Sequence, residues 1–230
     1  MKVAGLLGGM SWESTVPYYR VLNEVVKERL GGLHSAEVVL YSVDFHEVEA
    51  LQRENRWDDA GARLAAAAVA LERAGAEFVV LCTNTMHKVA PVIERALSIP
   101  LLHIADATAA AVKAAGLRTV GLLGTRFTME QEFYVGRLRD QHGLDVMVPD
   151  SEDRAEVHRV IYEELCLGCV LAGSRVAYEG VIDRLVARGA QGVILGCTEI
   201  AMLVDPERLE VPAFDTATLH ARAAADYALE

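Results

Sequence analysis

The sequence has no long apolar run, and this shortage excludes an integral membrane protein. None of its apolar stretches approaches the roughly 18–20 uncharged residues that a membrane span needs. The start, Met1–Leu6, carries one positive charge and leads directly into a strand pattern, without the apolar region and cleavage site of a signal peptide. We therefore expect a cytoplasmic protein with no membrane partner.

Positive charge and cysteine are also scarce. Lys and Arg number 22 against 33 Asp and Glu, a net charge of -11, which argues against binding to nucleic acid. The four cysteines, Cys82, Cys166, Cys169 and Cys197, are too few for a disulfide framework and predict free thiols. Cys166 and Cys169 have C-x-x-C spacing but lack the second pair or histidine of a zinc site, so we interpret that spacing as coincidence.

Cofactor motifs are absent as well. The chain has no H-E-x-x-H, no G-x-S-x-G and no EF-hand loop, and no lysine is recognisably placed for a pyridoxal cofactor. The glycine turn at Gly5–Gly9 matches neither the full dinucleotide fingerprint nor a P-loop. It is either a plain strand-to-helix turn or a turn that binds a carboxylate at a helix start. We expect neither a metal nor an organic cofactor.

What is present is a regular alternation of strands and helices. Short apolar runs are separated by amphipathic segments, which predicts an α/β protein with parallel sheets. Two helix starts are expected to be capped, one by Ser14 or Thr15 and the other by a capping box of Thr128 and Gln131. The expected strands cover residues 2–7, 38–43, 78–81, 100–104, 119–125, 144–148, 193–195 and 211–214.

The pattern occurs twice. Residues 75–85 align with residues 189–199 at a constant offset of 114, and residues 119–125 echo residues 3–9. Two similar units of about four strands each are therefore expected. Ligands bind beyond the carboxyl ends of parallel strands, where all the glycine and small polar stretches fall.

The alignment places Thr83 opposite Cys197. A thiol after an apolar run is by default a small core residue. Cys197, however, lies past the last apolar residue and precedes Thr198 and Glu199 at an expected helix start, which would lower its pKa. Thr83 could cap a helix, while Cys82 should point into the core by strand parity. His87 could cap the helix, pack in the core or orient the Thr83 hydroxyl.

Three motifs together resemble the cofactor-independent aspartate/glutamate racemases. They are Gly5–Trp12, Thr83–His87 and Gly196–Glu199, and the resemblance extends from near residue 3 to beyond residue 215. It implies two Rossmann-like or flavodoxin-like units, related by a pseudo-twofold axis, with the active site in the cleft between them. The implied domains are residues 1–104 with 215–230, and residues 105–214. A small acidic amino acid as substrate and a homodimer are also implied.

The resemblance further implies racemisation by proton transfer between two bases on opposite faces of the α-carbon. Most members carry cysteine where this chain has Thr83, although a subgroup with threonine is known. Cys197 is then the better base, and the direction that needs Thr83 as base should be slower. Many members also carry a lysine near the position of Glu164. The expected substrate-binding residues are Met10, Ser11, Gln52, Asn84, Thr85, Thr125, Thr198 and Glu199.

Gln52 has no signal of its own, and an exposed helix surface is the alternative reading of that position. Two other functions fit the same motifs. One is a related isomerase or decarboxylase acting on another small carboxylate. The other is an amino-acid-binding protein without catalytic activity, which would not need a thiol at position 197.

Overall fold

A computed structural model describes the backbone of residues 1–230 and every side chain except that of Glu207. The chain forms two compact units. Unit 1 comprises residues 1–104 and 220–230, and unit 2 comprises residues 105–219. Over the described residues, no helix combines the length and apolarity needed to cross a bilayer.

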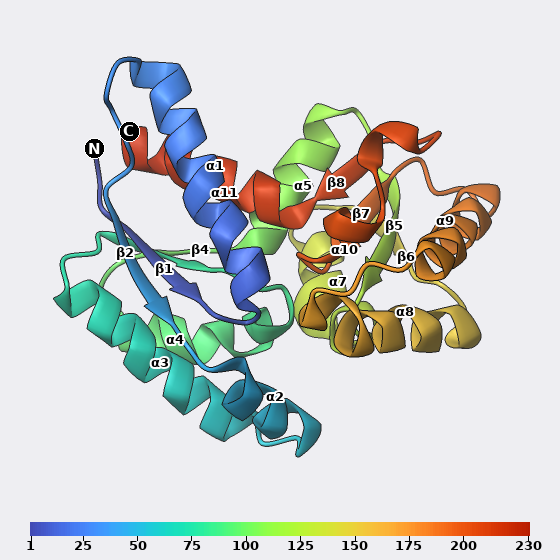
Figure 1. Cartoon of the computed structure of the whole chain (residues 1–230), viewed down its shortest axis with the longest axis horizontal. Coiled ribbons are helices and arrows are strands. Elements are labelled where there is room, and N and C mark those ends of the chain that lie inside the picture. The colour runs from blue at the N-terminus through green and yellow to red at the C-terminus, as the bar shows by residue number, and fades with distance from the viewer. The chain divides into compact units, whose positions relative to one another are not determined.

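Unit 1 contains a four-stranded parallel sheet (Figure 1). Helices α1 and α11 lie on one face of this sheet, and α3 and α4 lie on the other. The ring of Phe78 on the sheet meets that of Tyr227 on α11 at 5.0 Å between centroids. The elements are β1 (Ala4–Gly8), α1 (Trp12–Leu30), β2 (Val38–Ser42), α2 (Phe45–Arg53), α3 (Trp57–Arg73), β3 (Phe78–Leu81), η1 (Thr85–Val89), α4 (Ala90–Ala96), β4 (Leu101–Leu102) and the end of α11 (Thr216–Leu229).

Unit 2 repeats this plan around a second four-stranded parallel sheet. Helices α8 and α9 both pack on its strand β5. The elements are α5 (Ile104–Ala114), β5 (Thr119–Gly124), α6 (Arg126–Glu130), α7 (Glu132–Asp140), β6 (Asp145–Met147), α8 (Ser151–Glu163), η2 (Leu165–Leu167), α9 (Ala172–Ala187), β7 (Val193–Gly196), α10 (Ile200–Leu203), η3 (Pro206–Arg208) and β8 (Ala213–Asp215).

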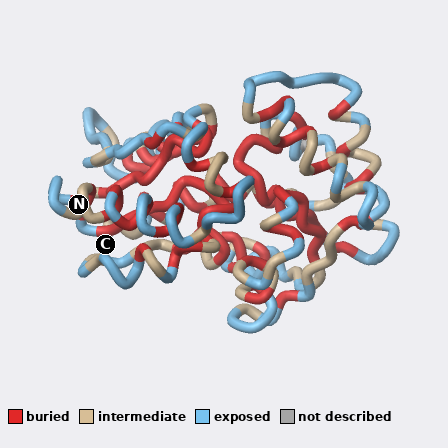
Figure 2. Tube along the Cα trace, turned by 90° about the horizontal axis from the view of Figure 1, so that it is seen from below, coloured by how far each residue is buried: buried red, intermediate tan, exposed pale blue. Residues whose placement is uncertain are grey.

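The two sheets have the same strand order, β2-β1-β3-β4 and β6-β5-β7-β8. The predicted α/β class with two four-stranded parallel sheets is therefore confirmed. The central strands are buried on both faces, as expected for parallel sheets covered by helices. Figure 2 shows this burial as continuous stretches inside each unit, with exposed residues on the outer helix turns and loops.

The glycine turn after β1 is required by close packing. A Cβ on Gly8 would lie 2.3 Å from Cγ2 of Thr15, and one on Gly9 would lie 2.3 Å from the carbonyl oxygen of Val43. Gly9 also has a φ of +90°, which side chains disfavour. The turn thus allows the chain to pass between strand β2 and the start of α1.

The two predicted helix caps are wrong. Helix α1 begins one turn earlier than expected, with Ser11 at its N-cap, and Ser14 and Thr15 lie inside its first turn and donate to the Ser11 carbonyl. Thr125, rather than Thr128, caps α6 by accepting from the Thr128 N–H. Because a short helix ends at residue 130, Gln131 starts the next helix and makes no side-chain capping bond.

The segment around residue 104 also differs from the prediction. The strand expected over residues 100–104 is only two residues long, and Ile104 already begins helix α5. This helix was not predicted. It is rich in alanine, whose small side chain differs little in hydrophobicity from polar residues. The periodic pattern of apolar residues that marks a helix is therefore weak here.

Candidate active site

The unit 1 half of the predicted site lies at the carboxyl ends of two neighbouring strands. Strands β1 and β3 pair in parallel, and Leu7 is opposite Leu81, so the segments that follow both strands leave the sheet at the same edge. These segments carry five predicted site residues, all of them buried: Met10, Ser11, Thr83, Asn84 and Thr85.

Cys82 lies in the core, as predicted from strand parity. Cys82 is fully buried, its Sγ points at the Val80 carbonyl oxygen, and burial raises the pKa of its thiol. Thr83 is 6% exposed. The backbone N–H of Cys82 donates to the Leu7 carbonyl oxygen, and the backbone N–H of Thr83 donates to the Leu81 carbonyl oxygen. Cys82 is therefore a core residue.

Gln52 also belongs to this region. It is only 4% exposed, and its Nε2 lies 2.9 Å from Sδ of Met86. Met86 in turn shares one buried cluster with Met10 and Leu7. The alternative reading of Gln52 as exposed helix surface is therefore wrong, and helix α2 carries this amide to the strand ends.

The unit 2 half of the predicted site lies at the equivalent strand ends of the second sheet. Strands β5 and β7 pair in parallel with Gly124 opposite Gly196. Thr125 follows the first strand and Cys197 follows the second. Gly196 is required there, because a Cβ would lie 2.8 Å from the Leu123 carbonyl oxygen.

Cys197 is the centre of a small hydrogen-bonded group. Its Sγ donates to Oε2 of Glu199 at 2.9 Å, and the Thr198 hydroxyl donates to the same oxygen at 2.8 Å. The Cys197 side chain is nearly buried, with 8% exposed, and Glu199 is 2% exposed. A thiol and a carboxylate are thus hydrogen-bonded to each other in a buried setting.

The prediction that a helix start lowers the pKa of Cys197 is wrong. Burial raises this pKa well above its usual value, and the negative charges of Glu199 and Cys166 raise it further. The backbone N–H of Glu199 donates to the sulfur and acts in the opposite direction, but it is outweighed. The helix concerned, α10, has only four residues, so its dipole is too small to offset a neighbouring carboxylate.

Four further residues of unit 2, Arg159, Glu164, Ser174 and Tyr178, were not singled out as a cluster from the sequence. Glu164 is buried and accepts from Ser174 Oγ at 2.5 Å and from Arg159 Nη1 at 3.0 Å. Tyr178 is fully buried, and burial followed by the charge of Cys197 raises its pKa. No local motif marks these residues, since they come from the end of α8 and from α9. Glu164, near which the sequence resemblance implies a lysine in many members, is thus a buried carboxylate with two donors.

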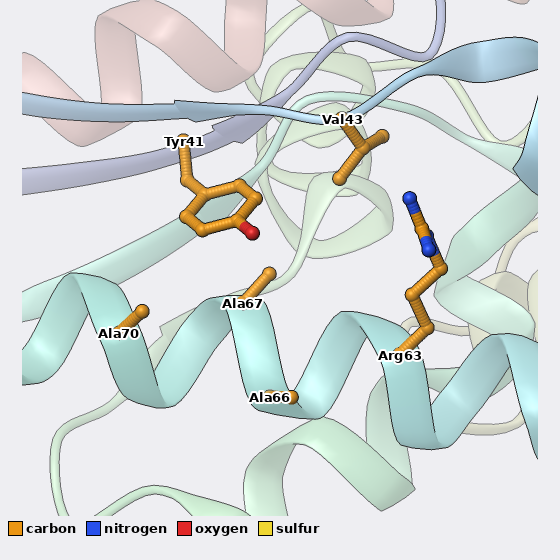
Figure 3. A pocket seen from close by; sticks show the side chains of 6 residues that line it. All are labelled: Tyr41, Val43, Arg63, Ala66, Ala67 and Ala70. Atoms are coloured by element: carbon orange, nitrogen blue, oxygen red, sulfur yellow. The ribbon is translucent and has the colours of Figure 1, made fainter.

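A pocket of about 270 Å³ lies elsewhere in unit 1, between β2 and α3 (Figure 3). Its walls are mainly alanine methyl groups, with the Tyr41 ring above them and Arg63 at one end. Arg63 is paired with Glu47, and none of the predicted site residues lines the pocket. Such a pocket lacks the convergent polar groups of a ligand site. Across the described residues, no group of three or more His, Cys, Asp and Glu side chains could hold a metal ion.

Comparison with known proteins agrees with the motifs. The family model of Asp/Glu/Hydantoin racemase matches residues 7–224. A candidate Asp/Glu racemase from Yersinia pestis is 60% identical over the full length of both chains, with a TM-score of 0.93. An aspartate racemase homologue from Pyrococcus horikoshii is 36% identical over the full length of both chains, with a TM-score of 0.86.

A curated relative is more distant. The broad specificity amino-acid racemase RacX of Bacillus subtilis is 24% identical over 95% of this chain and 94% of its own length. The aspartate racemase of Picrophilus torridus, at 22% identity and a TM-score of 0.78 over 99% and 94% of the two chains, shares the fold. The family match covers nearly the whole chain, and the protein therefore belongs to the Asp/Glu/hydantoin racemase family and is an amino-acid racemase.

Proposed function

We propose that this racemase interconverts the L and D forms of aspartate, glutamate or both, with Cys197 and Thr83 exchanging protons with opposite faces of the α-carbon. The observation that carries the proposal is the 2.9 Å contact between the Cys197 thiol and the Glu199 carboxylate. A buried thiol with a raised pKa is a poor base unless a neighbour takes its proton, and Glu199 is placed to do so.

The proton path then has three steps. The Cys197 S–H bond breaks as its proton passes to Glu199, which leaves a thiolate. The thiolate takes the α-proton of the substrate and forms a new S–H bond, leaving a carbanion. The Thr83 hydroxyl delivers its proton to the other face, and exchange with solvent restores both Thr83 and Glu199.

The carbanion needs stabilisation, because no electron sink is part of this scheme. We propose that backbone N–H groups near Ser11, Asn84–Thr85 and Thr198–Glu199 donate to the substrate carboxylate, in a site that excludes water. The side chains proposed to hold the rest of the substrate are Met10, Gln52, Thr125 and those of the same polar segments.

The two directions should differ in a defined way. A thiolate is a far more accessible base than a threonine alkoxide, so kcat should be larger when Cys197 abstracts the proton. Because the two enantiomers have equal free energy, kcat/KM must be the same in both directions. The slower direction is therefore expected to have a proportionally smaller KM.

The test is loss of the α-proton in deuterated water across a panel of L- and D-amino acids, followed by NMR and by chiral separation. Aspartate and glutamate should exchange and racemise, whereas Cys197→Ala should do neither. Cys169→Ala is the matched control, since Cys169 is exposed, and it should retain activity. Exchange at the normal rate in Cys197→Ala would show that the thiol is not the base, and exchange confined to other amino acids would overturn the substrate assignment.

A further inference from the structure

Three histidines form a buried cluster in unit 1 beside Thr83. His87, His103 and His220 are 1%, 7% and 0% exposed. The ring of His87 lies 4.3 Å from that of His103 and 6.0 Å from that of His220, measured between centroids. The proposed proton path uses none of them, so the cluster needs another explanation.

The hydrogen bonds of His87 assign its tautomer. Its Nδ1 lies 2.7 Å from the Thr83 carbonyl oxygen, which can only accept, so Nδ1 carries the proton. Its Nε2 accepts from the Ile104 N–H at 3.2 Å. Both ring nitrogens are therefore used by a neutral imidazole, which joins the end of β3 to the start of α5.

His220 has the opposite tautomer. Its Nε2 donates to the Leu102 carbonyl oxygen at 2.9 Å, and its Nδ1 is 3.0 Å from the Tyr18 hydroxyl, which donates to it. This second neutral histidine ties α1, β4 and α11 together next to His87. Within this cluster, His87 is the member that bonds to the Thr83 peptide, and His220 fixes the elements packed beside it.

We propose that His87 is a positioning residue for Thr83. Its Nδ1–H fixes the Thr83 carbonyl and hence the peptide from which the Thr83 side chain projects. The sequence left three roles open for His87: a helix cap, a core residue or an orienter of the Thr83 hydroxyl. The bond in the structure goes to the Thr83 backbone carbonyl instead of the hydroxyl. The inference rests on the proposed role of Thr83 in proton transfer.

Two substitutions separate the two bonds of His87. In His87→Asn the side-chain amide nitrogen falls near the position of Nδ1, so the bond to Thr83 is kept and the bond to Ile104 is lost. In His87→Gln the amide falls near the position of Nε2, so the bond to Ile104 is kept and the bond to Thr83 is lost. The two variants are matched, because each removes one of the two hydrogen bonds.

The readout is a ratio measured in deuterated water, starting from the pure enantiomer with the larger kcat, which is the one that Cys197 is proposed to deprotonate. Deuterium that enters the pool of this starting enantiomer reports return from Cys197 alone, while formation of the opposite enantiomer also requires Thr83. The ratio of inversion to exchange is independent of how much enzyme is folded. It should fall at least about tenfold in His87→Gln and stay within about twofold of wild type in His87→Asn, because misplacing a catalytic group by about 1 Å can cost as much as 100-fold in rate.

Other outcomes have distinct meanings. If the wild-type protein shows neither exchange nor inversion, the proposed function fails. If wild type is active and the two variants have equal ratios, the positioning role is wrong and His87 only supports the fold. A ratio that falls in His87→Asn but not in His87→Gln would assign the role to the Ile104 bond and also overturn the proposal.

Discussion

Replacing Glu199 by glutamine should make the Cys197 thiol more reactive and the enzyme slower. The carboxylate and the sulfur are 2.9 Å apart, and the negative charge of Glu199 is one cause of the raised pKa of Cys197. Glutamine has nearly the same shape and no charge. It therefore removes the repulsion that opposes the thiolate, and it also removes the group proposed to receive the thiol proton.

The expected size of the change follows from the distance. Two unit charges about 3 Å apart repel by roughly 5 kcal/mol at an effective dielectric constant of 20. Part of this repulsion is relieved because the pair shares a proton in the native protein. If only about a quarter of it is released, the resulting 1.4 kcal/mol or so changes the thiolate fraction about tenfold. The rate of alkylation of Cys197 at a fixed pH should rise by at least that factor.

The assay is alkylation with iodoacetamide, followed by mass spectrometry of the cysteine-containing peptides. Exposed Cys169 serves as an internal reference in the same sample. Glu163→Gln is the control variant. Glu163 is exposed, and its substitution removes one negative charge elsewhere in unit 2. Racemisation by Glu199→Gln should nevertheless fall about 100-fold, because in a substrate complex that excludes water the thiol loses the group proposed to take its proton, a loss in the range for removal of a general base. Slower alkylation of Cys197, or undiminished racemisation, would refute the reasoning.

Three other changes have defined outcomes. Thr83→Cys should bring the kcat values of the two directions closer together, as measured by chiral chromatography from each pure enantiomer. Gly196→Ala should lower the free energy of unfolding by about 1–3 kcal/mol in urea, because its Cβ would overlap the Leu123 carbonyl, whereas Gly173→Ala within α9 meets no neighbour and should stabilise by up to about 1 kcal/mol. Burial raises the pKa of Asp106, but its bonds with Arg137 and His142 together outweigh this and leave the pKa below its usual value. This stabilisation is therefore present at neutral pH and is lost in acid. Asp106→Asn should cost about 1 kcal/mol at pH 7 after solvent screening, and the difference from wild type should disappear as the pH falls through the folded pKa of Asp106.

The sequence was sufficient for the architecture because the strand signal is strong in this fold. Strands buried on both faces appear as uninterrupted apolar runs, such as Phe78–Leu81 and Val193–Gly196, and their repetition at a fixed offset reveals the second sheet. The misplaced helix caps have a different origin. Helix starts depend on single side-chain contacts, and several Ser and Thr residues near each start compete for the same role.

The electrostatics of the site could not be read from the sequence. The residue order Cys197-Thr198-Glu199 indicates a helix start, which would lower a thiol pKa. Whether Glu199 points at the sulfur depends on a side-chain rotamer and on burial, which follow from tertiary contacts such as that of α10 with η2. The same limit applies to Gln52, whose burial against Met86 depends on how α2 packs.

The proposed difference between Thr83 and Cys197 as bases also depends on the groups that contact them. The group that contacts Cys197 is a carboxylate, which can take a proton from the thiol. The group that contacts Thr83 is the imidazole of His87, which bonds to the Thr83 backbone carbonyl and accepts from the Ile104 N–H. Under the proposed mechanism, the thiolate of Cys197 is therefore made locally by Glu199, whereas Thr83 acts as a proton donor. Thr83→Cys alone should then narrow the difference between the directions without removing it, because the new thiol would still lack a carboxylate of its own. Full equality would require a second proton acceptor near position 83.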